Sequence, residues 1–316
     1  MLFKPSEPEE GNQPRLREKA RISRRPSQKT GIEIRVLRQE DPDYPPLLRG
    51  IPEPPHCLYA IGDLGLLKQR TLAVVGSRKC SEYGKRVAMQ IGKAAAQNRV
   101  TLVSGMAKGI DSFAHLGALR AGGKTIAVLG CGVDICYPRE NEKIYAEIAE
   151  KGLLLSQFPP GMEARPYTFP QRNRVIAGLA EAVTVVEAGT NSGALITAEH
   201  AAALSREIFA VPGNITSSCS LGCNKLLMDG ASPIAVIDDI FLGMGLTPAA
   251  DPQETAALGR DEQLVYRLIQ KQGETSIDFL CQELQKDSIY VTGILSVLEI
   301  KGLVAYHFGK IFIAKM

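Results

Sequence analysis

Short apolar runs alternate with amphipathic helical patterns along the middle of the chain. The runs are rich in β-branched residues and several of them end in glycine, which is typical of strands buried on both faces of a parallel sheet. They occupy residues 72–78, 100–105, 125–132, 153–156, 182–186, 208–214 and 233–237. Helical patterns fill the intervals, at residues 82–98, 110–121, 141–151, from 175 onward, 193–203 and 224–229. This alternation predicts an α/β fold with an open, mainly parallel sheet covered by helices on both faces.

The last part of the chain has a different pattern. Three helical patterns precede two short alternating strands, and they occupy residues 261–271, 276–285, 290–301 and then 302–313. Three helices followed by a hairpin are typical of a winged helix-turn-helix. We therefore expect a small C-terminal winged-helix domain over residues 261–316. A linker over residues 245–260 would join it to a main domain over residues 71–244.

The first seventy residues carry weaker signals. Residues 1–31 are rich in Pro, Ser, Glu, Lys and Arg and poor in apolar side chains, a composition that predicts a disordered basic tail. Residues 32–70 contain an alternating stretch that fits an edge strand, followed by proline-rich connectors. We expect them to form a lead-in segment that packs on the main domain.

Composition excludes some classes of protein. The 316 residues carry a formal net charge of only +3, which favours no class of partner by itself. The chain has neither an apolar stretch of about eighteen residues nor the apolar core of a signal peptide, so we expect a cytoplasmic protein without a membrane partner. Seven cysteines, an odd number, indicate reduced thiols. Tryptophan is absent, so stacking on bases would fall to Phe, Tyr or Arg.

The stretch 165–202 combines features of an anion-binding site. A buried strand leads through the glycine-rich turn 187–193 into a helix that Ser192 caps and that continues to Ala203. Backbone amides and the helix dipole attract anions at such a helix start. The sequence therefore predicts an anion site at the N-terminus of this helix.

Basic and aromatic residues stand just ahead of this strand. Phe169, Arg172, Asn173 and Arg174 precede a helical pattern that opens at Val175, so we interpret them as part of a neighbouring turn. Two arginines arriving from that turn indicate that the bound anion is a phosphate.

The carboxyl ends of the other predicted strands carry similar residues. Ligands bind beyond these ends in an open parallel sheet. The ends read Gly76-Ser77-Arg78, Ser104-Gly105-Met106, Gly130-Cys131-Gly132, Glu187 to Gly193, and Gly213-Asn214. Glycines and small hydroxyl residues at one edge permit close backbone approach to phosphates. We therefore expect a phosphate-binding surface there.

Known nucleotide motifs do not match this surface. Residues 122–125 resemble the end of a Walker loop, but its first glycine falls on Ala118 and its lysine precedes a strand. Residues 130–132 supply only two glycines of the dinucleotide fingerprint, whose third falls on Ile135. ATP hydrolysis and NAD binding are therefore weakly supported, and no cofactor is expected.

Catalytic and metal-binding signals are weak as well. His115 follows Asp111 by four residues and His200 adjoins Glu199, so each pair permits acid–base chemistry, but hydrogen-bonded helical histidines are the more common case. Four cysteines lie near predicted strand ends without the usual zinc spacing, so no metal is expected: Cys131, Cys136, Cys219 and Cys223.

Several segments together resemble the DNA-processing protein A family, DprA/Smf. They are the Gly76-Ser77-Arg78 turn and residues 104–115, 127–141, 169–188, 192–215 and 222–227, so the resemblance covers about residues 35–240. It implies an extended Rossmann-like domain that binds single-stranded DNA in natural transformation, protects it, dimerises and helps to load the RecA recombinase. The resemblance implies no enzymatic turnover.

The family's Gly-Ser-Arg turn and basic FPxRNR segment line its DNA pocket. By that resemblance, together with the strand-end pattern, the candidate DNA-binding residues are Gly76, Ser77, Arg78, Ser104, Gly105, Lys108, Phe169, Arg172, Asn173, Arg174, Glu187, Ser192, Gly193, Thr197 and Asn214. Arginines would neutralise phosphates, and Phe169 would offer one base a stacking surface. Family behaviour also suggests a homodimer through residues 226–228.

Three features leave alternatives open. Many family members carry a helical domain before the Rossmann-like part, which about 35 tail-like residues cannot hold. The expected recognition helix, residues 289–300, carries Glu299 and little positive charge, which favours protein interaction or packing over duplex reading and weakens a transcription-factor hypothesis. A phosphoribohydrolase-like enzyme acting on nucleotides is the main alternative function, with Glu187 or Glu199 as its catalytic carboxylate.

Overall fold

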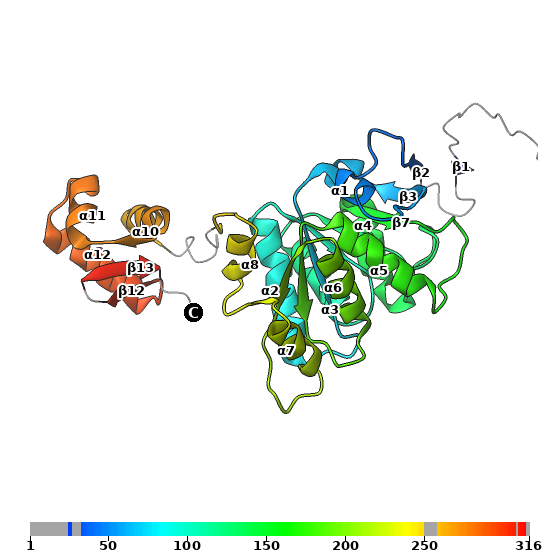
Figure 1. The fold of residues 1–316 in the computed structure, drawn as a ribbon. Helices are drawn as coiled ribbons and strands as arrows, with labels where there is room; N and C mark the ends of the chain where they lie inside the picture. Colours follow the sequence, from blue (N-terminus) through cyan, green and yellow to red (C-terminus); the bar gives the residue numbers. More distant parts are fainter. Residues whose placement is uncertain (1–24, 27–32, 250–257, 308, 314–316) are drawn as a thin grey trace, which may run out of the picture.

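The computed structural model describes residues 25–26, 33–249, 258–307 and 309–313 (Figure 1). The predicted disordered tail lies outside the described residues except for Arg25 and Pro26, and so do residues 250–257 of the predicted linker. Among the described residues, no helix has both the length and the apolar character needed to span a membrane.

An open sheet forms the centre of the main domain, with strand order β1-β2-β3-β7-β6-β5-β4-β8-β9-β10. Its strands are β1 (Arg25–Pro26), β2 (Glu33–Arg38), β3 (Cys57–Gly62), β4 (Thr71–Gly76), β5 (Thr101–Ser104), β6 (Thr125–Val128), β7 (Leu153–Ser156), β8 (Ala182–Val186), β9 (Glu207–Ala210) and β10 (Ser232–Pro233). From β7 to β10 all neighbours pair in parallel, whereas β1, β2 and β3 are antiparallel to their neighbours. The predicted open, mainly parallel α/β sheet is confirmed.

Helices cover both faces of this sheet (Figure 1). They are α2 (Glu82–Gln97), α3 (Ile110–Arg120), α4 (Glu142–Lys151), α5 (Thr168–Leu179), α6 (Gly193–Ala203), α7 (Leu221–Met228) and α8 (Asp238–Gly243). The two faces follow from alternation along β4, since Leu72 and Val74 pack with α2 and α3, whereas Ala73 and Val75 pack with α5 and α6.

Two glycines allow α2 and α3 to pack closely. A Cβ atom on Gly92 of α2 would lie 2.2 Å from the carbonyl oxygen of Ala114, and one on Gly117 of α3 would lie 2.2 Å from that of Met89. Both contacts are with backbone, which cannot move aside as a flexible side chain can. The close spacing between these helices therefore requires a residue without a side chain at both positions.

Residues 33–70 contribute strands β2 and β3 to the main sheet. Between them lies the short helix α1 (Pro46–Arg49), and the 3₁₀ helix η1 (Leu64–Lys68) follows β3. Tyr44 is fully buried, and its hydroxyl donates a 2.7 Å hydrogen bond to the carbonyl of Pro55. The sequence pattern indicated the first strand but missed β3, because prolines on its N-terminal side made the whole segment resemble a connector.

The described C-terminal residues form a unit with its own apolar core. It contains α10 (Arg260–Gln272), β11 (Glu274–Thr275), α11 (Ile277–Leu284), α12 (Ser288–Ile300), β12 (Val304–His307) and β13 (Lys310–Ile313), with sheet order β11-β13-β12. The three expected helices and the expected terminal hairpin are present. The winged-helix assignment and the domain boundaries stay predictions.

Candidate functional site

A cavity of about 650 Å³ opens at the carboxyl ends of β4 and β8, where the sequence predicts a site. We call it the cleft. Nine of the candidate residues line it: Gly76, Ser77, Arg78, Phe169, Arg172, Asn173, Ser192, Gly193 and Thr197. They come from the turn after β4, from α5 and from the start of α6, so three sequence-distant segments meet around one cavity.

The basic segment lies on helix α5. This helix begins at Thr168, whose hydroxyl donates to the carbonyl of Gly130 at 2.5 Å and lies 3.2 Å from the amide of Arg165. The interpretation of Phe169 to Arg174 as part of a turn was therefore wrong, because the helix begins about two helical turns before Val175, where the sequence pattern placed its start. Since residues three and four apart share a helix face, Phe169 and Arg172 point to one side and Arg174 to another.

Two guanidinium groups lie close to the ring of Phe169 at the cleft. Arg78 lies 5.0 Å from its ring centroid and Arg172 lies 5.8 Å from it, both within the range of a cation–π contact. The ring packs on Gly130, where a Cβ atom would lie 3.0 Å from the ring atom Cδ1. Tyr137 completes the group, with ring centroids 5.7 Å apart. The result is a half-buried aromatic ring with positive charge around it.

The two cleft arginines differ in exposure. Arg78 is exposed, but the side chain of Arg172 is only 4% exposed and is held by the protein itself. Nη1 of Arg172 donates to the carbonyls of Gly105 and, at 2.8 Å, Val128, while Nε donates to Asn173 at 3.1 Å. Burial lowers the pKa of Arg172 from its usual value. Only Nη2 lacks an acceptor among the described residues, so most of its bonding capacity is structural.

Asp111 supplies the charge opposite Arg172. Its carboxylate is 5% exposed and accepts hydrogen bonds from the amides of Gly105 at 3.1 Å and Ala107 at 3.3 Å. Burial raises the pKa of Asp111, while the charge of Arg172 and these amides act in the opposite direction. Ser104 is buried nearby, where its hydroxyl donates to the carbonyl of Val74 at 2.6 Å. The candidate residues Ser104 and Gly105 therefore lie behind the cleft wall, whereas Asp111 is part of the cleft lining.

The start of α6 forms the opposite wall of the cleft. Ser192 caps this helix as predicted, with its hydroxyl accepting from the amide of Ala194 at 3.3 Å. Asn173 ties the helix start to α5 by donating to the carbonyl of Gly193 at 3.0 Å. A Cβ atom on Gly193 would meet open space, so the backbone here is accessible from the cleft. A helix N-terminus of this kind attracts anions.

Four other candidate residues lie outside the cleft lining. Lys108 pairs with Glu140, and Asn214 accepts hydrogen bonds from the amide and hydroxyl of Thr216. Glu187 is 6% exposed and accepts hydrogen bonds from the amide and hydroxyl of Ser81 at the start of α2, so its carboxylate is occupied by a helix cap.

The fourth residue, Arg174, lies 3.5 Å from Glu53 in a separate cavity of about 690 Å³. Arg174 therefore does not join Arg172 at the cleft, as the two arginines of one predicted turn were expected to do.

The sequence pattern missed some residues of the lining. Lys79 is exposed and lines the cleft next to Arg78. Ser218 and Cys219 line it as well, and so do Thr190 and Asn191, which lie in the predicted turn 187–193 but were not named as candidates. Lys79 follows the Gly-Ser-Arg turn directly, so its position was a usable signal; the segment around Ser218 and Cys219 carried none.

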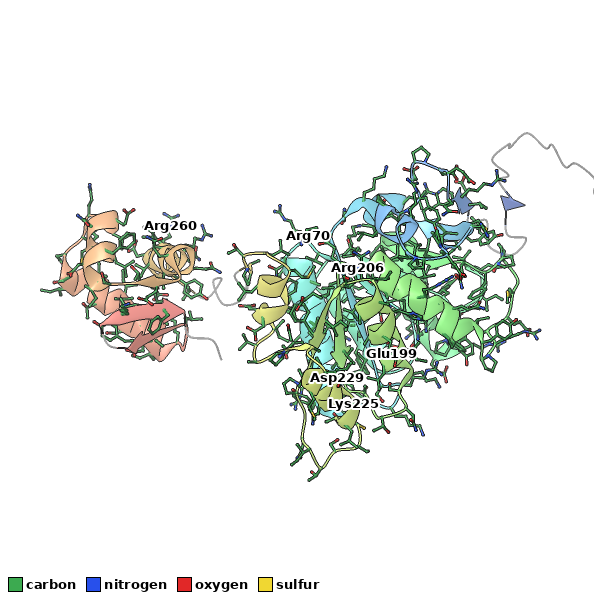
Figure 2. All side chains as sticks on the ribbon, viewed as in Figure 1. Arg70, Glu199, Arg206, Lys225, Asp229 and Arg260 are labelled. Atoms are coloured by element: carbon green, nitrogen blue, oxygen red, sulfur yellow. The ribbon has the colours of Figure 1, made fainter. Side chains whose placement is uncertain are left out.

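The histidine and glutamate pairs do not form a catalytic arrangement. His115 is fully buried, and its Nδ1 lies 2.6 Å from the hydroxyl of Thr125 instead of pairing with Asp111. Burial lowers the pKa of His115 to about 3. Glu199 is exposed on α6 (Figure 2). The described residues hold no group of three or more His, Cys, Asp or Glu side chains placed to bind a metal.

The profile of a protein family, described as DNA recombination-mediator protein A, matches residues 35–245. The chain belongs to this family. Protein Smf of Synechocystis sp. is 40% identical over 235 residues, which cover 73% of this chain and 59% of that protein. DNA processing protein DprA of Streptococcus pneumoniae is 43% identical over 201 residues, covering 64% of this chain and 71% of that one. The chain thus spans less than two thirds of the Synechocystis relative.

Solved structures agree with the family assignment. The X-ray structure of DNA processing protein A from S. pneumoniae matches with a TM-score of 0.64 and 41% identity, over 68% of this chain and 74% of that one. DNA processing protein A from Helicobacter pylori, whose structure is described in terms of its single-stranded DNA binding mode, matches with a TM-score of 0.61 and 30% identity. That match covers 67% of this chain and 95% of the H. pylori chain. The resemblance to the DprA/Smf family is confirmed.

Proposed function

We propose that the protein binds single-stranded DNA in the cleft. The observation that carries the proposal is the pairing of two exposed cations, Arg78 and Lys79, with the half-buried ring of Phe169 at one cavity mouth. Cations neutralise phosphates, and an aromatic ring stacks on a base of any sequence. The family membership and the described binding mode of the H. pylori relative support the same ligand.

Each part of the cleft has a role in this proposal. Arg78 and Lys79 contact phosphates, and the N-terminus of α6 at Gly193 accepts another from its backbone amides. Phe169 stacks on one base. Arg172 acts mainly through its support of the wall, with Nη2 as its one group available to the strand. Affinity should therefore tolerate changes of base sequence and fall steeply with salt.

The wider role is also a proposal. The protein acts without turnover, as a cytoplasmic homodimer that protects incoming single strands in natural transformation and helps to load RecA onto them. His115 is buried against Thr125 and the carboxylate of Glu187 accepts hydrogen bonds from Ser81, so neither side chain lines the cleft in which we place the ligand. The C-terminal unit serves protein interaction or packing, since the outer face of α12 exposes Ile289 and Ile300 at 85% and 87%.

The test is a fluorescence-anisotropy titration of labelled oligo-dT across a salt series. Wild type should bind tightly with a steep slope of log affinity against log salt, and Arg78→Ala should reduce that slope by about 0.7, the value for one phosphate contact. Arg120→Ala, which removes an exposed arginine from the far end of α3, is the matched control. Absence of binding by wild type would refute the function. A wild-type slope in Arg78→Ala would refute the site.

A further inference from the structure

An exposed tyrosine extends the aromatic surface of the cleft. Tyr137 lies on the loop between β6 and α4, and its side chain is 46% exposed. Its ring centroid is 5.7 Å from that of Phe169, and the two ring planes meet at 42°. The tyrosine is not part of the cleft lining, so its ring stands at the rim, next to the ring that we expect to stack on a base. Tyr137 is not among the residues assigned to DNA binding above.

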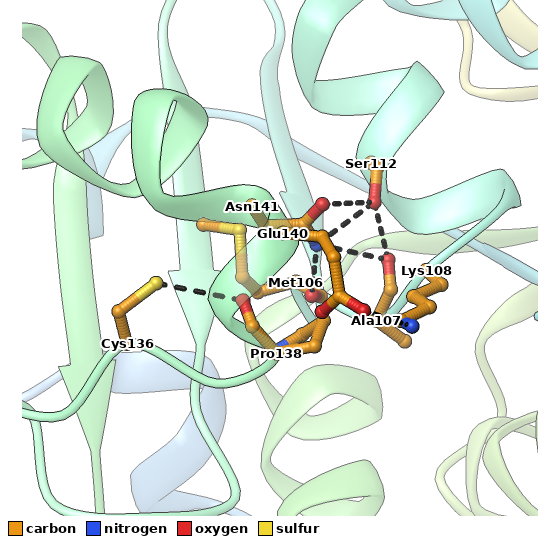
Figure 3. A network of polar contacts seen from close by, with 8 residues as sticks. All are labelled: Met106, Ala107, Lys108, Ser112, Cys136, Pro138, Glu140 and Asn141. Carbon is orange, nitrogen blue, oxygen red and sulfur yellow. Dashed lines mark hydrogen bonds and ion pairs between the residues drawn. The ribbon is translucent and has the colours of Figure 1, made fainter.

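Polar contacts hold the loop that carries Tyr137, and Figure 3 shows those made by residues in its C-terminal half. On its C-terminal side the buried Asn141 donates to the carbonyl of Met106 at 2.7 Å and to the hydroxyl of Ser112 at 2.9 Å. Glu140 forms an ion pair with Lys108, and the thiol of Cys136 lies 3.5 Å from the carbonyl of Pro138. The candidate residue Lys108 therefore has a role in this anchoring.

The N-terminal half of the loop is held in the same way. The hydroxyl of Tyr145 donates to the carbonyl of Val133 at 2.6 Å, and the thiol of Cys131 donates to the carbonyl of Ile135 at 3.3 Å. The amide of Gly132 donates to the carbonyl of Met162 at 2.7 Å. An exposed aromatic ring on a loop held at this many points keeps its position before a ligand arrives. Such preorganisation lowers the entropic cost of binding.

We propose that Tyr137 is a second base-stacking residue, which takes the nucleobase next to the one on Phe169. The proposal rests on the proposed binding of single-stranded DNA. Phe169 has Arg78 at 5.0 Å and Arg172 at 5.8 Å, so its ring is shared with two cations, whereas Tyr137 is 46% exposed. Two neighbouring rings that are tilted to each other suit two successive bases of a strand bending out of the cleft, and a base of any sequence has a stacking face.

The test compares Tyr137→Ala and Tyr137→Phe with wild type in the oligo-dT anisotropy assay. We expect Tyr137→Ala to weaken binding by about five-fold to 150-fold, the range for one lost base–aromatic stack, with the salt slope unchanged because no phosphate contact is lost. Tyr137→Phe keeps the ring and should stay within about two-fold of wild type. Tyr306→Ala, which removes a tyrosine of similar exposure, 48%, from β12, is the matched control.

A second ligand separates stacking from a structural role of the loop. On an oligonucleotide of abasic sugar–phosphate units, Tyr137→Ala and wild type should bind equally, since no base is present to stack. A loss that persists on the abasic strand, a changed salt slope, or wild-type affinity of Tyr137→Ala for oligo-dT would each overturn the proposal. If wild type binds no oligo-dT at all, the proposed function itself fails, and that outcome is distinct from these three.

Discussion

Replacement of Arg172 by alanine tests whether this arginine is mainly a structural residue. Its guanidinium is 4% exposed and donates to the buried carbonyls of Gly105 and Val128 and to Asn173. Alanine leaves these acceptors without donors and removes the positive charge near the buried carboxylate of Asp111. Each orphaned buried acceptor costs about 1–3 kcal/mol, and the buried carboxylate of Asp111 loses a favourable nearby charge.

We therefore expect Arg172→Ala to lower the free energy of unfolding by about 3–5 kcal/mol. Urea unfolding followed by far-ultraviolet circular dichroism measures it, since the chain has no tryptophan to report fluorescence. Arg78→Ala is the comparison, because the exposed Arg78 loses only a cation–π contact with Phe169, worth about 0.5–1 kcal/mol. An Arg172→Ala stability within about 1 kcal/mol of wild type would refute the structural role.

Two more predictions follow from packing and burial. Gly92→Ala should destabilise the main domain by about 1–3 kcal/mol in the same urea assay, because its Cβ would overlap the backbone of Ala114. Gly293→Ala in α12, where the Cβ meets open space, should instead stabilise the C-terminal unit by about 0.5–1 kcal/mol. If both substitutions changed the free energy of unfolding in the same direction, the packing argument would be contradicted. His115 has an ordinary pKa of 6.5 that burial lowers to about 3, so its contribution to stability is complete above pH 6.5 and falls by about 2 kcal/mol at pH 5. His115→Gln should remove that part of the stability difference between pH 7 and pH 5, and an unchanged difference would show that the histidine is not buried in its neutral form.

The sequence alone predicted most of the parallel sheet, for a physical reason. Strands such as β4 and β8 are buried on both faces and carry nearly continuous apolar or β-branched runs, and the intervening helices show a clear helical period. β10 is shorter than the predicted run because the pattern does not show where pairing with β9 ends. Helix α8 was not predicted, since at six residues it is too short to show a period.

The candidate site was predictable in its location but less so in the roles of its residues. Strand ends and a capped helix mark the edge of the sheet, and that edge does hold the cleft. Sequence cannot distinguish an arginine that points into solvent from one that points into the protein. Glu187 illustrates the same limit, since its position after β8 suggested a ligand, whereas its carboxylate caps α2 through Ser81.

The start of α5 decides how the FPQRNR segment is used. Because Thr168 already belongs to the helix, Phe169, Arg172 and Asn173 share the face toward the cleft, and Gln171 and Arg174 line the second cavity. Pro170 lines both cavities. Read as a turn, the segment would bring both arginines to one phosphate. As a helix it brings one ring and one buried guanidinium to the cleft and sends the other guanidinium, that of Arg174, toward Glu53. The positive charge available to a strand in the cleft therefore comes from Arg78 and Lys79 on the opposite turn, and the salt dependence of binding should follow those two residues more than either arginine of α5.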